Sequence, residues 1–283
     1  MDPTNPHNSS QGMLGSRQRR LGKNPTPDGT KQMRKTMADY RNIQARTSAG
    51  MRVDAGIDQG LRSYMLKVYN LMGLGLLITG IAAWGAFQLA VTGDGQLTAF
   101  GTLIYASAFR WVVILAPLAA VFFLSFRIQS MSVAAAQATF WVYSGLVGLS
   151  LSTIFLVYTG ASITQTFFAT AAAFGGLSLY GYTTKRDLSA FGSFLVMGVV
   201  GLVIAMLINI FLQSSALGFA ISAIGVLIFA GLTAYDTQTI KDMYYEGDGA
   251  DVAGRKATMG ALRLYLDFIN LFMFLLQFMG DRR

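Results

Sequence analysis

The sequence predicts an all-α integral membrane protein with seven transmembrane helices. Hydrophobic residues make up 53% of the 283 positions and charged residues only 13%, about half of the roughly 25% found in soluble domains. The apolar residues gather in continuous runs, most of them near the ~20 residues that a helix needs to cross a bilayer. These runs do not alternate between apolar and polar positions, which excludes a membrane β-barrel.

Seven apolar runs follow one another along the chain. We expect spans at residues 68–91, 111–126, 133–157, 163–182, 191–212, 217–235 and 258–279. Short polar segments typical of turns, such as TGDGQ, YTGAS and QSS, separate several of them. The second run is short for a full crossing, and the longest gap, residues 237–257, precedes the last span.

The beginning of the chain has a different composition. Residues 1–60 are predicted to be a disordered basic tail, followed by a seven-helix transmembrane domain over residues 61–283. Twelve Lys and Arg against five Asp and Glu lie in residues 1–67. Residues 1–36 are expected to be an upstream extension, because the amino-acid composition changes at Met37. No signal peptide is expected, since the first long apolar run begins near Val68.

Basic residues predict the orientation. With the N-terminus inside, the inner loops hold six Lys and Arg besides the tail, as the positive-inside rule requires. We therefore expect a multi-pass protein of the cell inner (plasma) membrane with a cytoplasmic N-terminus and the lipid bilayer as its partner. Arg282 and Arg283 are discordant, because seven full spans would place them outside. No folded nucleic-acid-binding module accompanies the tail, so no nucleic-acid partner is expected.

Composition also excludes several chemistries. The chain has no cysteine and one histidine, His7, which lies in the polar tail. A Ser-His protease arrangement inside the membrane is therefore excluded, as are thiolate metal sites. No Walker, haem or dinucleotide signature is present. We expect a protein that is not an enzyme and that holds no resident cofactor.

Three charged residues in or beside the spans are the candidate functional groups. Asp236 ends the sixth span, Asp267 lies about nine residues into the seventh, and Arg127 ends the second. An ionised side chain at the bilayer centre costs about 2.5–3.5 kcal/mol on insertion scales. With the N-terminus inside, all three fall in the cytoplasmic half. Such residues are expected to be paired, hydrated or functional.

The last span carries a polar stripe. Arg263, Asp267, Asn270 and Gln277 are spaced by four, three and seven residues, so they share one helical face. A buried polar seam that only holds helices together is one interpretation of this face. A functional cavity is the other, and the sequestered carboxylates favour it.

Two neighbouring carboxylates in a low-dielectric site repel each other and are expected to share a proton. Their oxygens are also the ligands that a hard cation such as calcium prefers. Arg127 would favour the charged forms. Proton, cation and arginine would then compete for the same oxygens, which makes the trio a candidate pH-dependent switch.

Three long segments closely resemble the Bax inhibitor-1 family, also called the transmembrane BAX inhibitor motif family. They are YTGASITQTFFATAAAFGGLSLYGYTTKRDLS, ISAIGVLIFAGLTAYDTQTIK and GALRLYLDFINLF. DQGLRSYMLKVYNLMGLGLLITG is similar to the bacterial members, and the resemblance runs from about Met37 to the C-terminus.

The resemblance implies a fold and a function. It implies seven helices with the last one central and surrounded by the other six, and a pH-sensitive calcium leak whose sensor is an aspartate pair. That pair falls on Asp236 in AYDTQ and Asp267 in LYLDF, and the latching arginine on Arg127 in LSFRIQSMS. Tyr235, Arg263 and Asn270 would support the site.

Two other functions stay open. The chain could be a non-conducting membrane regulator that binds a membrane-anchored AAA-type protease or a stress-response partner, as the resemblance implies. It could also be an intramembrane aspartyl protease, since Tyr235 and Asp236 form a Tyr-Asp pair. Those proteases carry Gly-x-Gly-Asp at the second aspartate, whereas Leu264, Tyr265 and Leu266 precede Asp267 here.

Overall fold

The computed structural model describes the backbone of residues 29–283 and the side chains from Gln59 onward. Helix α1 runs from Gly29 to Ala90. The predicted domain boundary at residues 60 and 61 stays a prediction, and residues 1–28 of the predicted tail lie outside the described residues. Residues 29–60 are helical here and not coil, because a helix that is already formed extends at little cost into residues such as Met, Arg and Ala.

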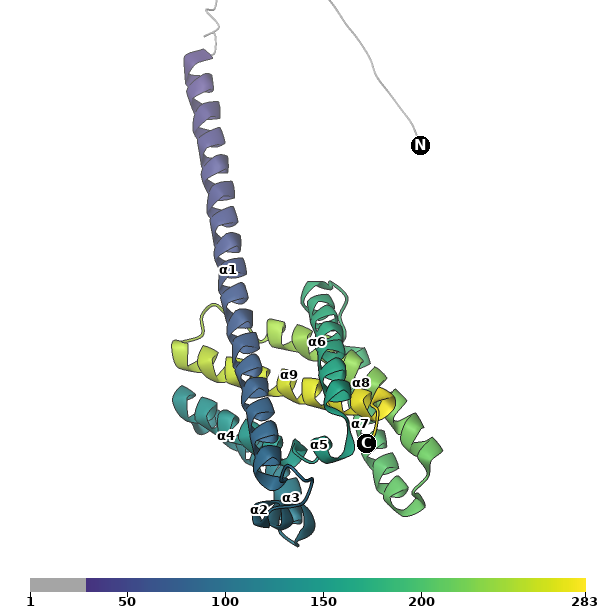
Figure 1. Ribbon diagram of the computed structural model, residues 1–283. Helices are drawn as coiled ribbons and strands as arrows, with labels where there is room; N and C mark the ends of the chain where they lie inside the picture. The colour runs from purple at the N-terminus through teal and green to yellow at the C-terminus, as the bar shows by residue number, and fades with distance from the viewer. Residues whose placement is uncertain (1–28) are drawn as a thin grey trace, which may run out of the picture. The chain divides into compact units, whose positions relative to one another are not determined.

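The described part of the chain consists of helices joined by short non-helical segments, and it has no strand beyond two isolated β-bridges. After α1 come α2 (Ala99–Gly101), the π-helical turn η1 (Thr102–Ala106), α3 (Arg110–Arg127), the 3₁₀ turn η2 (Ile128–Ser130), α4 (Val133–Leu151), α5 (Ile154–Val157), α6 (Gly160–Thr183), α7 (Ser189–Leu212), α8 (Ser215–Asp242) and α9 (Ala250–Met279). Figure 1 shows α9 running between α4, α6 and α8. The predicted all-α class is confirmed.

Six helical stretches in the described residues are long and apolar enough to cross a membrane. They are Gln59–Ala90, Arg110–Ser130, Val133–Val157, Ser189–Leu212, Ser215–Asp242 and Ala250–Met279. Each corresponds to one of the seven predicted spans. The remaining predicted span, residues 163–182, lies in the 24-residue helix α6, which is not among the six and contains four Thr, four Gly, two Ser and one Gln. The protein is therefore a multi-pass membrane protein.

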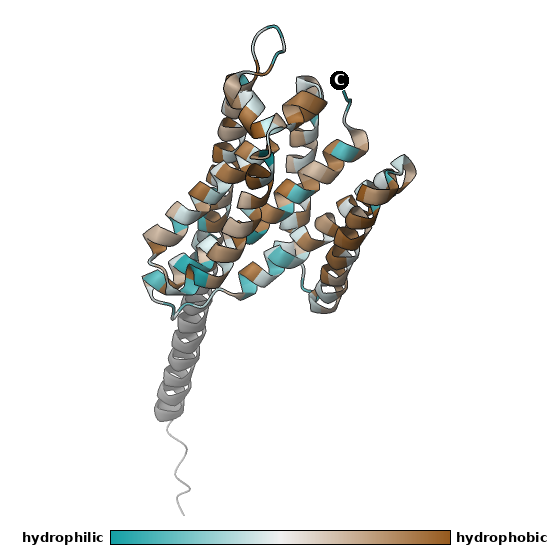
Figure 2. Ribbon diagram, turned by 90° about the horizontal axis from the view of Figure 1, so that it is seen from below, coloured by the Kyte–Doolittle hydropathy of each residue, from teal (hydrophilic) through white to brown (hydrophobic). Residues whose placement is uncertain are grey.

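The polar turns of the sequence supply helix caps. Ser132, Thr159 and Ser214 precede α4, α6 and α8, and each side-chain oxygen accepts a bond from the backbone N–H three residues later. Ser and Thr are favoured there because they satisfy a donor that the first helical turn leaves free. Figure 2 shows apolar residues along the helices and hydrophilic ones at the turns between them.

Small residues let the helices approach closely. A side chain at Gly181 would collide with the carbonyl oxygen of Ala234, where α6 meets α8. A side chain at Gly148 would lie about 2.5 Å from the carbonyl oxygen of Thr79, where α4 meets α1. Close backbone contact at small residues is how helices pack in lipid, where no hydrophobic effect drives them together.

Candidate functional site

Helices α8 and α9 pack tightly along their length and bring the two predicted aspartates together. The buried hydroxyl groups of α8 near Asp236 have hydrogen-bond partners. The hydroxyl of Thr233 donates to the carbonyl oxygen of Phe229, and that of Thr237 donates to the carbonyl oxygen of Thr233. On α9, Asp267 is only 4% exposed, and its neighbours Tyr265 and Phe268 are buried as well. Asp267 thus lies inside the helix bundle rather than on its lipid face.

The carboxyl groups of Asp236 and Asp267 lie next to one another, and Arg263 is the cationic group that acts on both of them among the described side chains. A guanidinium nitrogen of Arg263 lies 3.8 Å from Oδ1 of Asp236, a long ion pair. The side chain of Arg263 is 40% exposed and that of Asp236 is 16% exposed. Among the described residues, Oδ2 of Asp267 is buried and accepts no bond from an N–H or hydroxyl donor, and a proton shared with the carboxyl group of Asp236 would give it a partner. The inner carboxylate is therefore the less satisfied of the two.

Charge counting shows what this arrangement can do. Two ionised carboxylates beside one arginine leave a net negative charge in a poorly solvated position, where an uncompensated charge is expensive. A proton or a cation bound between the carboxyl groups would balance it. The described residues hold no cluster of three or more Asp, Glu, His or Cys that could bind a metal, so the pair offers two carboxylate ligands and not a closed metal cage.

Arg127 is not brought to the pair. It lies exposed at the end of α3 and forms no ion pair with any residue whose side chain is described. Its neighbours Leu124 and Ile128 are fully buried in the same apolar core as Leu264. The end of α3 therefore packs against the bundle, while the guanidinium group of Arg127 points out of it. The latch role of Arg127 stays a prediction.

Two supporting residues predicted beside the pair have other partners. The ring of Tyr235 lies against Gly192 on α7, where it packs on the α7–α8 apolar cluster. Asn270 is half-buried, and its side-chain nitrogen donates to the carbonyl oxygen of Leu266 over 2.8 Å. Of the supporting residues, only Arg263 contacts a carboxylate of the pair.

Buried hydroxyl groups around the pair were not predicted. The hydroxyl of Thr79 on α1 lies 2.6 Å from that of Tyr265 on α9, and it donates to the carbonyl oxygen of Ser144 on α4 over 2.9 Å. These bonds tie three helices together two residues from Asp267. A lone Thr in an apolar run is the only sequence signal. Such a residue usually bonds within its own helix, and the hydroxyl of Thr79 also lies 3.0 Å from the carbonyl oxygen of Gly75.

This geometry defines a multi-pass helical membrane protein with an acidic pair buried between two of its helices. The family model described as inhibitor of apoptosis-promoting Bax1 matches residues 61–283. The chain therefore belongs to the Bax inhibitor-1 family. The family predicted from the sequence motifs is confirmed.

Bacterial relatives match over most of their length. The chain is 48% identical to the inner membrane protein YbhL of Escherichia coli over 226 residues, which cover 79% of this chain and 94% of YbhL. It is 45% identical over 247 residues to the uncharacterized protein RP147 of Rickettsia prowazekii, covering 87% of this chain and all of RP147. An uncharacterized protein of Caulobacter vibrioides is 46% identical over 249 residues, again covering 87% of this chain and all of the relative.

Proposed function

We propose that this protein is a pH-sensitive calcium leak channel of the inner membrane, with Asp236 and Asp267 as both ion pathway and pH sensor. The observation that carries the proposal is the buried carboxyl group of Asp267 beside that of Asp236, with an Oδ2 that accepts no bond from an N–H or hydroxyl donor among the described residues. A bundle that only needed a polar seam would be expected to satisfy that oxygen, because an orphaned buried acceptor destabilises a fold. A pair of carboxyl groups with an unsatisfied oxygen can bind a cation or a proton transiently.

We further propose seven crossings, with α6 as the additional one. Its 24 residues carry no charged side chain and would span about 36 Å at 1.5 Å per residue. The end of α9 supports this count. The backbone N–H of Arg283 donates to the carbonyl oxygen of Val157, and that of Asp281 donates to the hydroxyl of Ser162. The C-terminus thus meets the start of α6, as an odd number of crossings from a cytoplasmic N-terminus requires.

The central position of α9 belongs to the same proposal. Helices α4, α6 and α8 all contact it, and its apolar window is the most buried of the six, at 61%. A central helix reaches both membrane faces without touching much lipid. It can therefore carry a polar stripe at a depth where lipid-exposed charges are costly.

Competition for the carboxylate oxygens would provide the pH dependence. Calcium binds ionised carboxylates, and a shared proton occupies the same lone pairs, so acidification is expected to weaken calcium binding at the pair. The guanidinium group of Arg263 would compete with calcium and the proton for the carboxylate of Asp236. Arg127 remains the proposed latch, which would require its side chain to turn inward from the end of α3.

The test is calcium flux into liposomes that contain the purified protein. Replacing Asp236 or Asp267 with Asn removes one ligand charge, and we expect flux to change by on the order of tenfold and to lose its dependence on pH. Asp251→Asn, an exposed aspartate in the first turn of α9, is the matched control and should behave like the wild type. Unchanged flux and pH dependence in both pair variants, with folding intact, would contradict the proposal.

A non-conducting regulator that binds a membrane-anchored AAA-type protease is the second candidate. One observation favours it: the loop between α8 and α9 is held in a defined shape. The ammonium group of Lys256 donates to Asp248 over 2.6 Å and to the carbonyl oxygen of Met243 over 3.0 Å. An ordered loop costs a partner less entropy on binding than a mobile one. Wild-type protein that binds such a protease yet passes no calcium would favour this function.

A further inference from the structure

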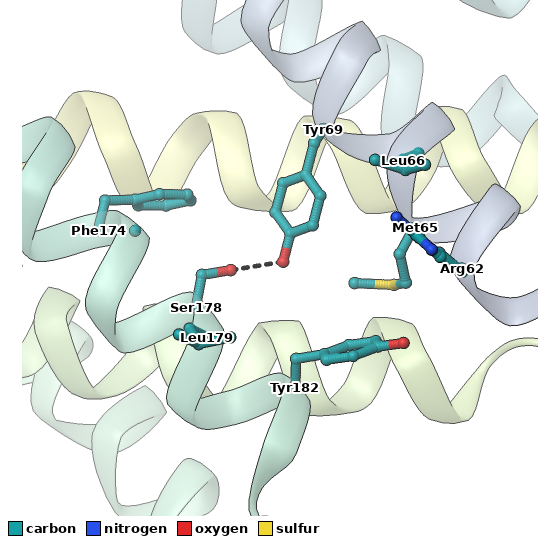
Figure 3. A pocket seen from close by; sticks show the side chains of 9 residues that line it. Arg62, Met65, Leu66, Tyr69, Phe174, Ser178, Leu179 and Tyr182 are labelled. Carbon is teal, nitrogen blue, oxygen red and sulfur yellow. Dashed lines mark hydrogen bonds between the residues drawn. The ribbon is translucent and has the colours of Figure 1, made fainter. Parts of the chain in front are cut away.

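A groove lies between α1 and α6. Its cavity volume is about 440 Å³. Apolar groups form most of its lining, namely Met65, Leu66, Phe174, Gly175 and Leu179. Figure 3 shows the side chains of Met65, Leu66, Phe174 and Leu179 around the groove, and that of Tyr69 reaching across it to Ser178. Leu66 and Leu179 are exposed, so the groove opens sideways.

Hydroxyl groups close the inner wall of the groove. The hydroxyl of Tyr69 lies 2.6 Å from that of Ser178, drawn as a dashed line in Figure 3. Ser178 in turn lies 2.9 Å from the hydroxyl of Thr237 on α8. These bonds fix α1, α6 and α8 relative to one another at this depth. The groove is therefore preformed and does not depend on an occupant to open it.

One end of the groove is cationic. Arg62 lines it near Tyr182, the penultimate residue of α6. The ammonium group of Lys241 donates to the carbonyl oxygen of Tyr182 over 3.2 Å. Arg62 is thus the basic group of the groove lining, Lys241 is bonded to the backbone at the same end of α6, and the opposite end at Phe174 is apolar. A ligand that fits has a negative head and a hydrocarbon tail.

The position of the groove in the membrane indicates which ligand of this kind it binds. A groove that opens sideways between two spans faces hydrocarbon, where no water is available to fill it. Lipid acyl chains are the molecules in contact with that opening, and basic side chains at a helix end attract anionic headgroups. We propose that this groove binds one anionic phospholipid, with its phosphate on Arg62 and an acyl chain along Met65, Phe174 and Gly175.

This inference rests on α6 crossing the membrane, as proposed above, but not on calcium conduction. Its test therefore measures bound lipid and not flux, so that the two proposals can fail separately. The full chain is incorporated into nanodiscs of equal phosphatidylglycerol and phosphatidylcholine, released gently into detergent, and weighed by native mass spectrometry. The wild type is expected to retain one phosphatidylglycerol.

Gly175 offers a way to fill the groove without disturbing the fold. A Cβ atom at Gly175 would meet no atom within 4 Å, and the same holds for Gly176, its neighbour outside the groove lining. Gly175→Leu is expected to reduce retained phosphatidylglycerol at least fivefold. Gly176→Leu, which changes the helix in the same way, should retain as much as the wild type. Equal retention in the two glycine variants would overturn the proposal.

The headgroup is tested at Arg62, which is exposed and whose replacement does not threaten folding. Each basic side chain near a membrane surface favours an anionic lipid by about fivefold. Arg62→Gln is therefore expected to lower the preference for phosphatidylglycerol over phosphatidylcholine by about that factor. Retention of both lipids in equal amounts by the wild type would show a nonspecific lipid layer and overturn the proposal.

Discussion

Helices α7 and α9 are both long enough to cross a membrane, yet one lies on the outside of the bundle and the other inside it. The apolar window of α7 is 11% buried and that of α9 is 61% buried. The more hydrophobic of the two is α7, which reverses the rule for soluble proteins. In lipid the apolar face points outward, because acyl chains solvate it as well as a protein core would. Polarity, rather than hydrophobicity, therefore marks the inner helix.

The largest expected effect comes from replacing a glycine with leucine, once on the inner side of the bundle and once on the outer helix. A side chain at Gly225 on α8 would lie about 2.6 Å from the ring of Phe274 on α9, whereas one at Gly201 on α7 meets nothing within 4 Å. Gly225→Leu is expected to destabilise the fold by about 3 kcal/mol through overpacking. Gly201→Leu should be neutral or slightly stabilising. Thermal unfolding in detergent measures both.

Equal melting temperatures for the two variants would mean that α8 and α9 can move apart at little energetic cost to accommodate the leucine. The bundle would then have no rigid centre, and the difference in burial between α7 and α9 would have little energetic meaning. A drop confined to Gly225→Leu instead makes the α8–α9 interface the main support of the fold.

A smaller effect is expected from single hydroxyl groups on the two helices. Tyr265 on α9 is fully buried, its ring packs edge-on against Phe140, and its hydroxyl meets Thr79. Tyr265→Phe keeps the ring and removes the bond between helices, so we expect a loss of about 1 kcal/mol. Ser193 on α7 is exposed and bonds only to the carbonyl oxygen of Ser189 among the described residues.

Ser193→Ala is the control and should change stability by less than about 0.5 kcal/mol. The melting temperature of each variant in the same detergent makes the comparison. If removing the hydroxyl of Ser193 cost as much as removing that of Tyr265, hydrogen bonds between helices would not distinguish the inner helix from the outer one.

The sequence predicted most of the helices because length and hydropathy are local properties. Predicted spans 133–157 and 191–212 agree with the structure to within a few residues. Helices α8 and α9 extend further than predicted, to Asp242 and from Ala250. Their extra turns are polar, and hydropathy cannot tell a polar helical turn from a loop.

The site was predicted only in part, because rotation of a helix about its axis is not a local property. Asp236, Asp267 and Arg263 could be placed together from spacing and depth. Arg127 has the right depth but faces outward, and nothing in LSFRIQSMS reveals which way that turn faces. The contact of Thr79 with Tyr265 joins residues 186 positions apart, and no pattern in either segment predicts the other.

The smallest expected effect concerns the polar start of α7. The hydroxyl and the backbone N–H of Ser189 both hydrogen-bond Asp187 just before the helix, and they lower the pKa of that carboxyl below its usual value. A lowered pKa stabilises the folded state above the unfolded value and loses that contribution as pH falls through the folded pKa. Asp187→Asn should therefore lower the melting temperature slightly near pH 7, and this difference should shrink as the pH falls through the folded pKa, which lies below the usual value. Since Asp187 is fully exposed, only a small effect is expected. A large loss of stability at neutral pH would show that the start of α7 contributes as much to the fold as the buried contacts of α9.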